Sequence, residues 1–335
     1  MTKLLYLLTF ILIFYSSSLL GSDYRVINAH IDQGESVSAN SLYVCSSSKP
    51  GGRGKTISCR NHVDLVEVFS VRAHAGFFRD YIPFLTLGFP RDLQVLSSYL
   101  LSAGTDSRVM LWDVDSGEVV WRHSFHSDAV WKVDSDGSFV VSSGRDGKVI
   151  AVDFDSGKLI WTHSYHKKNS PSEHMVRSVV VRGDKVVSSG FDGCVVVSSV
   201  VDGSLLNKFC HDGRIKSADM YNGLIVYSPW GEYRKADIVA VDYDSGQVVW
   251  TGKYFEKGKK GYRGLSSGVE ELLIKSDVIF FAGDDGMVVS VDLYSGDLIF
   301  YHDIHSASVR SVSVFGNTLY SIDRDGVLVF FNLNK

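Results

Sequence analysis

The chain has 335 residues, with 12% aromatic and 21% charged residues, 31 glycines and 5 prolines. These values describe a folded, turn-rich chain and exclude disordered and coiled-coil proteins. The formal net charge is only -4, so no overall basic excess indicates nucleic-acid binding. We therefore expect no nucleic-acid partner.

The first 22 residues have the pattern of an export signal. One lysine precedes an apolar run from Leu4 to Phe14, and small polar residues follow. We predict a cleaved signal peptide over residues 1–22, which leaves no transmembrane segment in the mature chain. The alternative is a retained anchor, although Leu4–Leu20 is short for a span. The absence of an N-glycosylation sequon and of a KDEL-type tail favours a bacterial periplasm over secretion or the endoplasmic reticulum.

An eleven-residue motif occurs five times after this segment. AVDFDSGKLIW and AVDYDSGQVVW are its clearest copies, and each alternates apolar and polar residues around an Asp-Ser-Gly cluster. This pattern predicts a β-hairpin whose turn needs positive φ, which glycine adopts without steric cost. The copies lie 40 to 50 residues apart, the period of propeller blades. Their glycines are Gly117, Gly157, Gly203, Gly246 and Gly296.

A second hairpin turn precedes the first in most copies, and a histidine or its equivalent leads an alternating run further upstream. Each repeat therefore contains four antiparallel strands. We interpret the aspartates of the second turn as caps on the strand network rather than as catalytic bases. They are Asp106, Asp146, Asp192, Asp285 and Asp325.

The leading histidine, the turn aspartate and the dipeptide Trp112-Asp113 resemble the WD40 signature, although only this blade keeps the dipeptide. The copies that begin at Ala151 and Ala240 resemble the repeat of the propellers related to pyrroloquinoline-quinone dehydrogenases. The resemblance covers nearly all of the mature chain and implies an all-β propeller. It says little about activity, because propellers host many unrelated functions.

The blade-leading positions predict seven blades in a single domain over residues 23–335. The C-terminal run supplies only three strands of the last blade, and residues 23–30 resemble a fourth strand without a blade. We therefore predict that the N-terminal strand pairs with the C-terminal blade and closes the ring. Eight blades are the alternative, because residues 77–92 are poorly patterned. The leading positions are His30, His74, His126, His174, His211, the neighbourhood of Gly264, and His305.

Four cysteines in a chain with an export signal predict two disulfides. Cys45 and Cys59 lie symmetrically about one predicted turn, and Cys194 and Cys210 lie symmetrically about another. Opposed residues on antiparallel strands are close enough to be bridged. We predict the pairs Cys45 with Cys59 and Cys194 with Cys210; free buried thiols are the alternative.

Three HxxH pairs are the strongest candidates for a metal site. Clustered neutral imidazoles could ligate zinc or copper. We favour a simpler interpretation, in which the second histidine of each pair leads a blade and contacts its turn aspartate. The pairs are His123 with His126, His163 with His166, and His302 with His305.

The sequence carries no strong catalytic motif. It contains no adjacent cysteines of the kind found in quinoprotein dehydrogenases, and no GxSxG, P-loop or HExxH motif. The acidic turns also lack the further ligands of a calcium loop. We therefore lean towards a non-catalytic protein without a cofactor. The alternative is a quinoprotein-like or metal-binding enzyme with a site in the central channel.

Charge is unevenly divided between the two expected faces. The turns between the third and fourth strands are acidic, whereas the long loops on the other face are basic and contain aromatic residues. This mixture suits contact with a protein; solvated loop lysines are the alternative. We predict a monomeric scaffold or assembly factor for another exported or envelope protein. Its predicted contact residues are Lys49, Arg53, Lys55, Lys167, Lys168, Trp230, Tyr233, Arg234, Lys235, Lys257, Lys259, Lys260 and Arg263.

Overall fold

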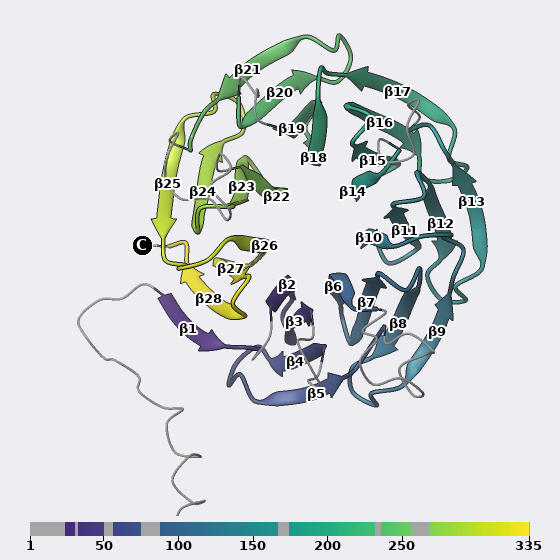
Figure 1. The fold of residues 1–335 in the computed structure, drawn as a ribbon, viewed down its shortest axis with the longest axis vertical. Coiled ribbons are helices and arrows are strands. Elements are labelled where there is room, and N and C mark those ends of the chain that lie inside the picture. Colours follow the sequence, from purple (N-terminus) through teal and green to yellow (C-terminus); the bar gives the residue numbers. More distant parts are fainter. Residues whose placement is uncertain are drawn as a thin grey trace, which may run out of the picture.

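Seven four-stranded antiparallel sheets lie in a circle around a central channel (Figure 1). The structure is a computed structural model, and it describes residues 24–30, 33–49, 56–74, 88–166, 174–231, 236–255 and 268–334. The fold is an all-β seven-bladed propeller, as the repeat spacing predicts. No helix in the described part of the chain is long and apolar enough to span a membrane.

Six blades are each built from four consecutive strands, with the first strand innermost (Figure 1). Blade 1 contains β2 (Gln33–Ala39), β3 (Tyr43–Lys49), β4 (Ile57–Asn61) and β5 (Glu67–Val71). Blade 2 contains β6 (Pro90–Leu96), β7 (Tyr99–Gly104), β8 (Val109–Asp113) and β9 (Val119–His123). Blade 3 contains β10 (Val130–Ser135), β11 (Phe139–Gly144), β12 (Val149–Asp153) and β13 (Leu159–His163).

The next three blades follow the same order. Blade 4 contains β14 (Val176–Arg182), β15 (Lys185–Gly190), β16 (Cys194–Ser199) and β17 (Leu205–Cys210). Blade 5 contains β18 (Arg214–Tyr221), β19 (Leu224–Trp230), β20 (Ile238–Asp242) and β21 (Val248–Gly252). Blade 6 contains β22 (Val269–Lys275), β23 (Val278–Gly283), β24 (Met287–Asp292) and β25 (Leu298–Asp303).

Blade 7 is assembled from both ends of the chain. Its inner three strands are β26 (Val309–Phe315), β27 (Thr318–Asp323) and β28 (Val327–Asn332), and its outer strand is β1 (Tyr24–Asn28). The antiparallel register of β1 and β28 runs from Tyr24 opposite Phe331 to Asn28 opposite Val327 (Figure 1). The predicted closure of the ring is therefore confirmed.

The apolar core lies between the blades, because each sheet has a neighbouring sheet on both faces. One cluster joins Leu111 of blade 2 to Ile150 of blade 3, and both side chains are fully buried. Another joins Val44 of blade 1 to Tyr320 of blade 7, across the closure. The middle strands therefore read as continuous apolar runs rather than as alternating ones.

The repeated motif is explained by contacts between successive blades. Trp121 ends the motif of blade 2, and its indole Nε1 donates to Phe154 O in blade 3 at 2.7 Å. A Cβ placed on Gly157, whose φ is 63°, would lie 2.7 Å from the Trp121 ring. The turn glycine of each copy thus packs against the aromatic ring of the preceding blade, and the aromatic ring of each copy packs against the turn glycine of the following blade. The same arrangement pairs Trp161 with Gly203, Phe209 with Gly246, and Trp250 with Gly296.

Every innermost strand contains a β-bulge at the same place. In β10, Val130 lies opposite Gly144 and Lys132 lies opposite Ser143, so Trp131 is the extra residue. Bulges turn a side chain away from its regular direction. The seven extra residues, in blade order, are Glu35, Arg91, Trp131, Arg177, Lys216, Glu270 and Arg310.

Candidate functional site in the central channel

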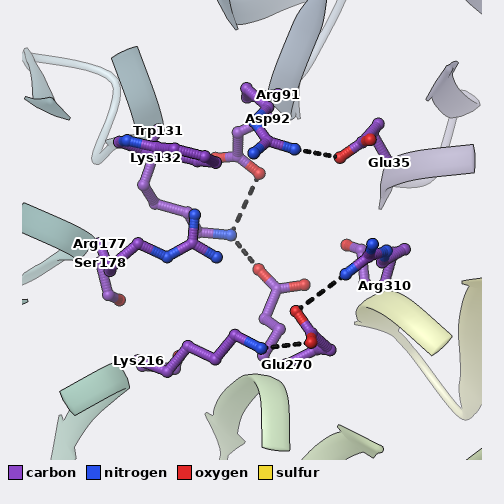
Figure 2. A pocket seen from close by; sticks show the side chains of 13 residues that line it. Glu35, Arg91, Asp92, Trp131, Lys132, Arg177, Ser178, Lys216, Glu270 and Arg310 are labelled. Carbon is purple, nitrogen blue, oxygen red and sulfur yellow. Dashed lines mark hydrogen bonds and ion pairs between the residues drawn. The ribbon is translucent and has the colours of Figure 1, made fainter. Parts of the chain in front are cut away.

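The seven bulge residues line a cavity of about 120 Å³ on the axis of the propeller (Figure 2). Six of the residues that immediately follow them complete its wall, so all seven blades contribute. The following residues in the wall are Asp92, Lys132, Ser178, Ser217, Glu271 and Ser311. The wall is thus polar and charged, although it is built on apolar strands.

The residues that follow the bulges mainly join one blade to the next. Leu93 N donates to Ser36 Oγ at 3.2 Å, which ties blade 2 to blade 1. Val133 N donates to Asp92 Oδ2 at 3.0 Å, which ties blade 3 to blade 2. Equivalent bonds run from Leu272 N to Ser217 Oγ, from Val312 N to Glu271 Oε2 and from Val37 N to Ser311 Oγ. These bonds set the spacing of the blades around the channel.

Lys132 departs from this pattern and crosses the channel. Asp134 accepts the bond from Val181 N at 2.8 Å instead, so Lys132 is not needed for the link to blade 4. Its Nζ lies 3.1 Å from Asp92 Oδ1 and also contacts Glu271 of blade 6 (Figure 2). Burial acts to lower the pKa of Lys132, but the two carboxylates outweigh it and raise that pKa.

The remaining wall carboxylates also contact cations. Arg91 Nη1 lies 2.7 Å from Glu35 Oε2, and Arg310 Nη1 lies 3.1 Å from Glu270 Oε2. Lys216 is a second partner of Glu270. Each of the four carboxylates in the cavity wall is therefore paired.

Arg177 is different from the other cations of the wall. In the described part of the chain it has no carboxylate partner, whereas Arg91 and Arg310 each have one; its buried Nε, like theirs, has no hydrogen-bond partner. Its guanidinium carbon lies 4.1 Å from the centre of the Trp131 ring, and that of Arg91 lies 3.7 Å from the same ring. Burial, followed by repulsion from Arg91, lowers the pKa of Arg177 to about 10.

Cations and aromatic rings alternate beside the cavity in blades 1 and 2. Lys49 Nζ lies 5.4 Å from the centre of the Phe89 ring, and the Arg91 guanidinium carbon lies 5.2 Å from it. Lys49 ends the second strand of blade 1, and Phe89 directly precedes the first strand of blade 2. Both therefore lie on the face that carries the connections between blades.

A similar group lies on the same face in blades 4 and 5. Phe191 and Trp230 stack with their ring centres 5.4 Å apart. The Arg214 guanidinium carbon lies 4.9 Å from the Phe191 ring, and Lys216 Nζ lies 5.7 Å from the Trp230 ring. Lys216 also lines the cavity, so this group is continuous with the channel.

Only two residues of the predicted contact surface fall in the described ranges, and they are Lys49 and Trp230. Both lie on the face expected for them and contact the aromatic groups above. The others lie outside the described residues, and partner binding by any of the predicted contact residues stays a prediction. They are Arg53, Lys55, Lys167, Lys168, Tyr233, Arg234, Lys235, Lys257, Lys259, Lys260 and Arg263.

The second histidine of each HxxH pair contacts an aspartate near the turn of its blade. His126 Nδ1 lies 3.0 Å from Asp146 Oδ1, and its Nε2 lies 3.0 Å from Ser142 Oγ. His166 Nδ1 lies 2.9 Å from Asp192 Oδ1. His166 thus takes the leading position of blade 4, where His174 was also expected.

In blade 7 the partner of His305 is Asp323 rather than Asp325, at 2.9 Å. Asp323 occupies the strand position that glycine fills in blade 3. A Cβ on that glycine, Gly144, would lie 2.7 Å from His126 Nδ1. A side chain at the same position in blade 7, that of Asp323, therefore contacts the leading histidine of its blade. Asp325 is exposed and does not take this role.

Blade 2 contains the most complete network of this type. His74 Nδ1 lies 2.7 Å from Asp106 Oδ1, and its Nε2 lies 2.9 Å from Ser102 Oγ. Trp112 Nε1 donates to the same hydroxyl at 2.9 Å. The network explains why this blade has a tryptophan before Asp113. In blade 6 the turn aspartate Asp285 accepts a bond from Met287 N at 3.2 Å.

The first histidines of the pairs pack against aromatic rings. The centre of the His123 ring lies 5.5 Å from that of Trp121 and 4.6 Å from that of Phe125. Burial, with a smaller effect of the neighbouring histidine, lowers the pKa of His123 to about 4 and that of His163 to about 3. The ring of His302 lies 4.0 Å from that of Phe331. No group of three or more potential metal ligands occurs among the described residues.

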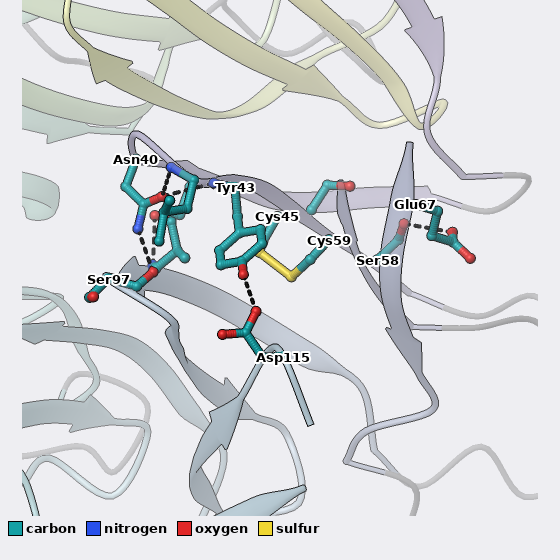
Figure 3. Close-up of a disulfide and its surroundings, with 12 residues drawn as sticks. Asn40, Tyr43, Cys45, Ser58, Cys59, Glu67, Ser97 and Asp115 are labelled. Atoms are coloured by element: carbon teal, nitrogen blue, oxygen red, sulfur yellow. Dashed lines mark hydrogen bonds between the residues drawn. A yellow bond between two sulfur atoms is a disulfide. The ribbon is translucent and has the colours of Figure 1, made fainter. Parts of the chain in front are cut away.

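Both predicted disulfides are present, each between opposed residues of adjacent strands. Cys45 on β3 is bonded to Cys59 on β4 (Figure 3), and Cys194 on β16 is bonded to Cys210 on β17. Their Cα atoms are 4.0 Å apart in both pairs. Beside the first disulfide, the Tyr43 hydroxyl donates to Asp115 of the next blade, and this bond raises the pKa of Tyr43 to about 12 (Figure 3).

The channel residues were not identified from the sequence, although it contains a signal for them. A triplet of the same kind lies at the start of every inner strand, beginning at its first or second residue, with a charged or aromatic residue between a small or apolar residue and a polar one. In chain order the triplets are GES, PRD, VWK, VRS, IKS, VEE and VRS. Aligning the repeats on their first strands, rather than on their hairpins, would have shown this position.

Known proteins support the fold and identify the family. Residues 85–209 and 234–335 match a family described as outer membrane protein assembly factor BamB. A search of the curated proteins finds no match. A chain in the crystal structure of the mitotic checkpoint complex is similar, with a TM-score of 0.73 at 16% identity over 93% of this chain and 91% of that one.

The computationally designed protein Ika8 is also similar, with a TM-score of 0.63 at 16% identity over 91% of this chain and 97% of that one. At this identity the two solved structures show the propeller fold alone. The family match covers more than half of the chain and both halves of the ring. The protein therefore belongs to the family described as outer membrane protein assembly factor BamB.

Proposed function

We propose that the protein is a non-catalytic, exported scaffold that binds another exported or envelope protein during its assembly. The partner contacts the face that carries the connections between blades. Membership of the BamB family supports a role in the assembly of outer-membrane proteins. The closed ring supports a scaffold, because it presents many loops on one rigid surface.

The observation that carries this proposal is the grouping of cations and aromatic rings on one face. Lys49, Phe89 and Arg91 form one group, and Phe191 and Trp230 belong to the other with Arg214. Aromatic residues and arginine are enriched in protein interfaces, where they contribute most of the binding energy. The predicted basic loops lie outside the described residues, and the strands that flank them end on this face.

Export is supported by two features of the chain. Disulfides form and persist in oxidising compartments, and all four cysteines are in disulfides. The N-terminal sequence also has the layout of an export signal. Together they favour the periplasm as the site of action.

Photo-crosslinking in the native compartment, followed by mass spectrometry, tests the contact face. A photoreactive residue in place of Phe191 should crosslink to one partner, and the same residue in place of Val249 on the outer rim should not. The double variant Lys259→Glu with Lys260→Glu should weaken that crosslink at least tenfold. Lys158→Glu with Lys275→Glu, on the opposite face, is the matched control.

Equal crosslinking from Phe191 and Val249 would contradict the proposal, as would a crosslink that survives the first charge reversal but not the control. Stoichiometric metal or quinone in the purified protein would instead support an enzyme with a site in the channel.

A further inference from the structure

We propose that the channel contains a binding site for a single carboxylate group, which the guanidinium of Arg177 holds beside Trp131. This inference does not depend on the identity of any partner protein. It follows from the pairing of charges in the cavity wall, which leaves one cation without a counterion.

The wall of the cavity has one more cation than it has carboxylates. Its cations are Arg91, Lys132, Arg177, Lys216 and Arg310, and its carboxylates are Glu35, Asp92, Glu270 and Glu271. All four carboxylates contact cations other than Arg177. Burial and a hydrogen bond to Glu270 raise the pKa of the nearby Asp284 carboxyl to about 7, so near neutral pH it carries only part of a negative charge.

Arg177 is placed to bind a ligand rather than to stabilise the fold. Its side chain extends into the channel between Lys132 and Lys216, with no interaction to either (Figure 2). Its Nε is buried without an acceptor, as are those of Arg91 and Arg310, but only Arg177 among these three also lacks a carboxylate partner. Leaving a buried charged donor without an acceptor costs free energy. An anion in the channel would supply the missing acceptor.

The charge of the cavity wall favours a carboxylate over a more highly charged anion. Its volume of about 120 Å³ exceeds the 10–15 Å³ that one water molecule needs, so a small group fits. A monoanion balances the single surplus charge, whereas a dianion would add repulsion from the four carboxylates. The planar guanidinium also matches a carboxylate with two parallel hydrogen bonds. The flat Trp131 ring limits one side of the site.

The carboxylate can come from a free organic acid or from an acidic side chain of a bound polypeptide. Two probes separate these sources. Sodium acetate tests the free acid, and the peptide acetyl-Gly-Glu-Gly-amide tests the side chain, with acetyl-Gly-Gln-Gly-amide as its neutral control. Sodium phosphate tests the preference for a carboxylate. Binding is measured by isothermal titration calorimetry on the purified full mature chain at low salt.

We expect saturable binding of acetate or of the Glu peptide, and weaker binding of phosphate. Arg177→Gln should weaken binding at least tenfold, whereas Arg122→Gln, an exposed arginine on β9, should leave it unchanged. Arg177→Lys keeps the positive charge but loses the planar guanidinium that can form two parallel hydrogen bonds. It should therefore weaken binding less than Arg177→Gln does. Tighter binding of the peptide than of acetate assigns the site to a polypeptide, and the reverse assigns it to a free acid.

Three outcomes would overturn the proposal. They are the absence of saturable binding by both probes, equal binding in Arg177→Gln and the wild type, and tighter binding of phosphate than of either carboxylate. Circular dichroism shows whether Arg177→Gln is folded, and Trp131→Leu is a second variant that should also weaken binding. Because the assay needs only this chain and small probes, its failure would leave the scaffold function untouched.

Discussion

The outer hairpins and the inner strands of this propeller are repeated in different ways. The outer hairpins repeat nearly the same residues, because each turn glycine receives the aromatic ring of the preceding blade. The inner strands repeat only a backbone feature, a bulge, and the residue on it varies among Glu, Arg, Trp and Lys. Packing between blades therefore constrains the outer residues, whereas the channel residues are constrained by their contacts with one another.

If this distinction is correct, the largest loss of stability should follow from removal of Lys132. The Lys132→Met variant should lose about 3–5 kcal/mol of unfolding free energy, because it leaves Asp92 and Glu271 buried without their shared cation. Chemical denaturation measures the loss. The triple variant that also carries Asp92→Asn and Glu271→Gln should recover part of it. A loss below about 1 kcal/mol in the single variant would show that the ion pairs across the channel contribute little.

The outer hairpin is tested by Gly203→Ala. A Cβ at this position would lie 2.7 Å from the Trp161 ring, and φ is 70°. We expect a loss of about 3 kcal/mol, from overpacking in addition to the cost of positive φ. Gly183→Ala is the matched control, with φ of 61° and no atom within 4 Å of the added Cβ, and should lose about 1 kcal/mol. Equal losses would mean that the aromatic contact does not matter.

We expect a smaller loss of unfolding free energy from the protonation of His123 as pH falls. Burial lowers its pKa to about 4, so folding favours the neutral ring. Its contribution is present above the pKa of the unfolded chain, about 6.5, and is lost as pH falls towards 4. His123→Phe keeps the stacking, and between pH 6.5 and 4 it should lose about 2 kcal/mol less stability than the wild type. Parallel stability curves for the two proteins, from denaturant titrations across this range, would refute the assignment.

The smallest change in unfolding free energy should follow from substitution of an exposed bulge residue on an outer strand. Val249 is the extra residue of β21 and is half exposed. Val249→Thr should change the unfolding free energy by less than about 0.5 kcal/mol in the same titrations. A larger loss would indicate that Val249 on the outer rim is buried against another molecule in the measured sample.

Most of the fold could be predicted from the sequence because the outer hairpins carry local signals. Glycine at a turn of positive φ and an aromatic at a fixed distance identify five of the seven blades, and opposed cysteines identify the register of two hairpins. The leading histidine of blade 4 was less certain, because His166 and His174 both precede the same strand. The choice depends on which ring reaches Asp192, and that distance is set by the folded loop.

The channel could not be predicted in the same way. A bulge breaks the alternation by which strand faces are assigned, so Arg177 and its equivalents do not follow the period of two. The ion pair between Lys132 and Glu271 also depends on which blades face each other across the ring. That relation exists only after all seven blades have been placed in the circle.

The pairing of β1 with β28 has a consequence for biogenesis. Among the described strands, β1 is synthesised first and finds its partner only in β28, which is synthesised last. Until then blade 7 is incomplete, and the nascent protein is an open crescent with two unpaired edges that could aggregate. A chaperone or holding factor that covers an exposed β-edge would therefore be needed most until β28 has emerged.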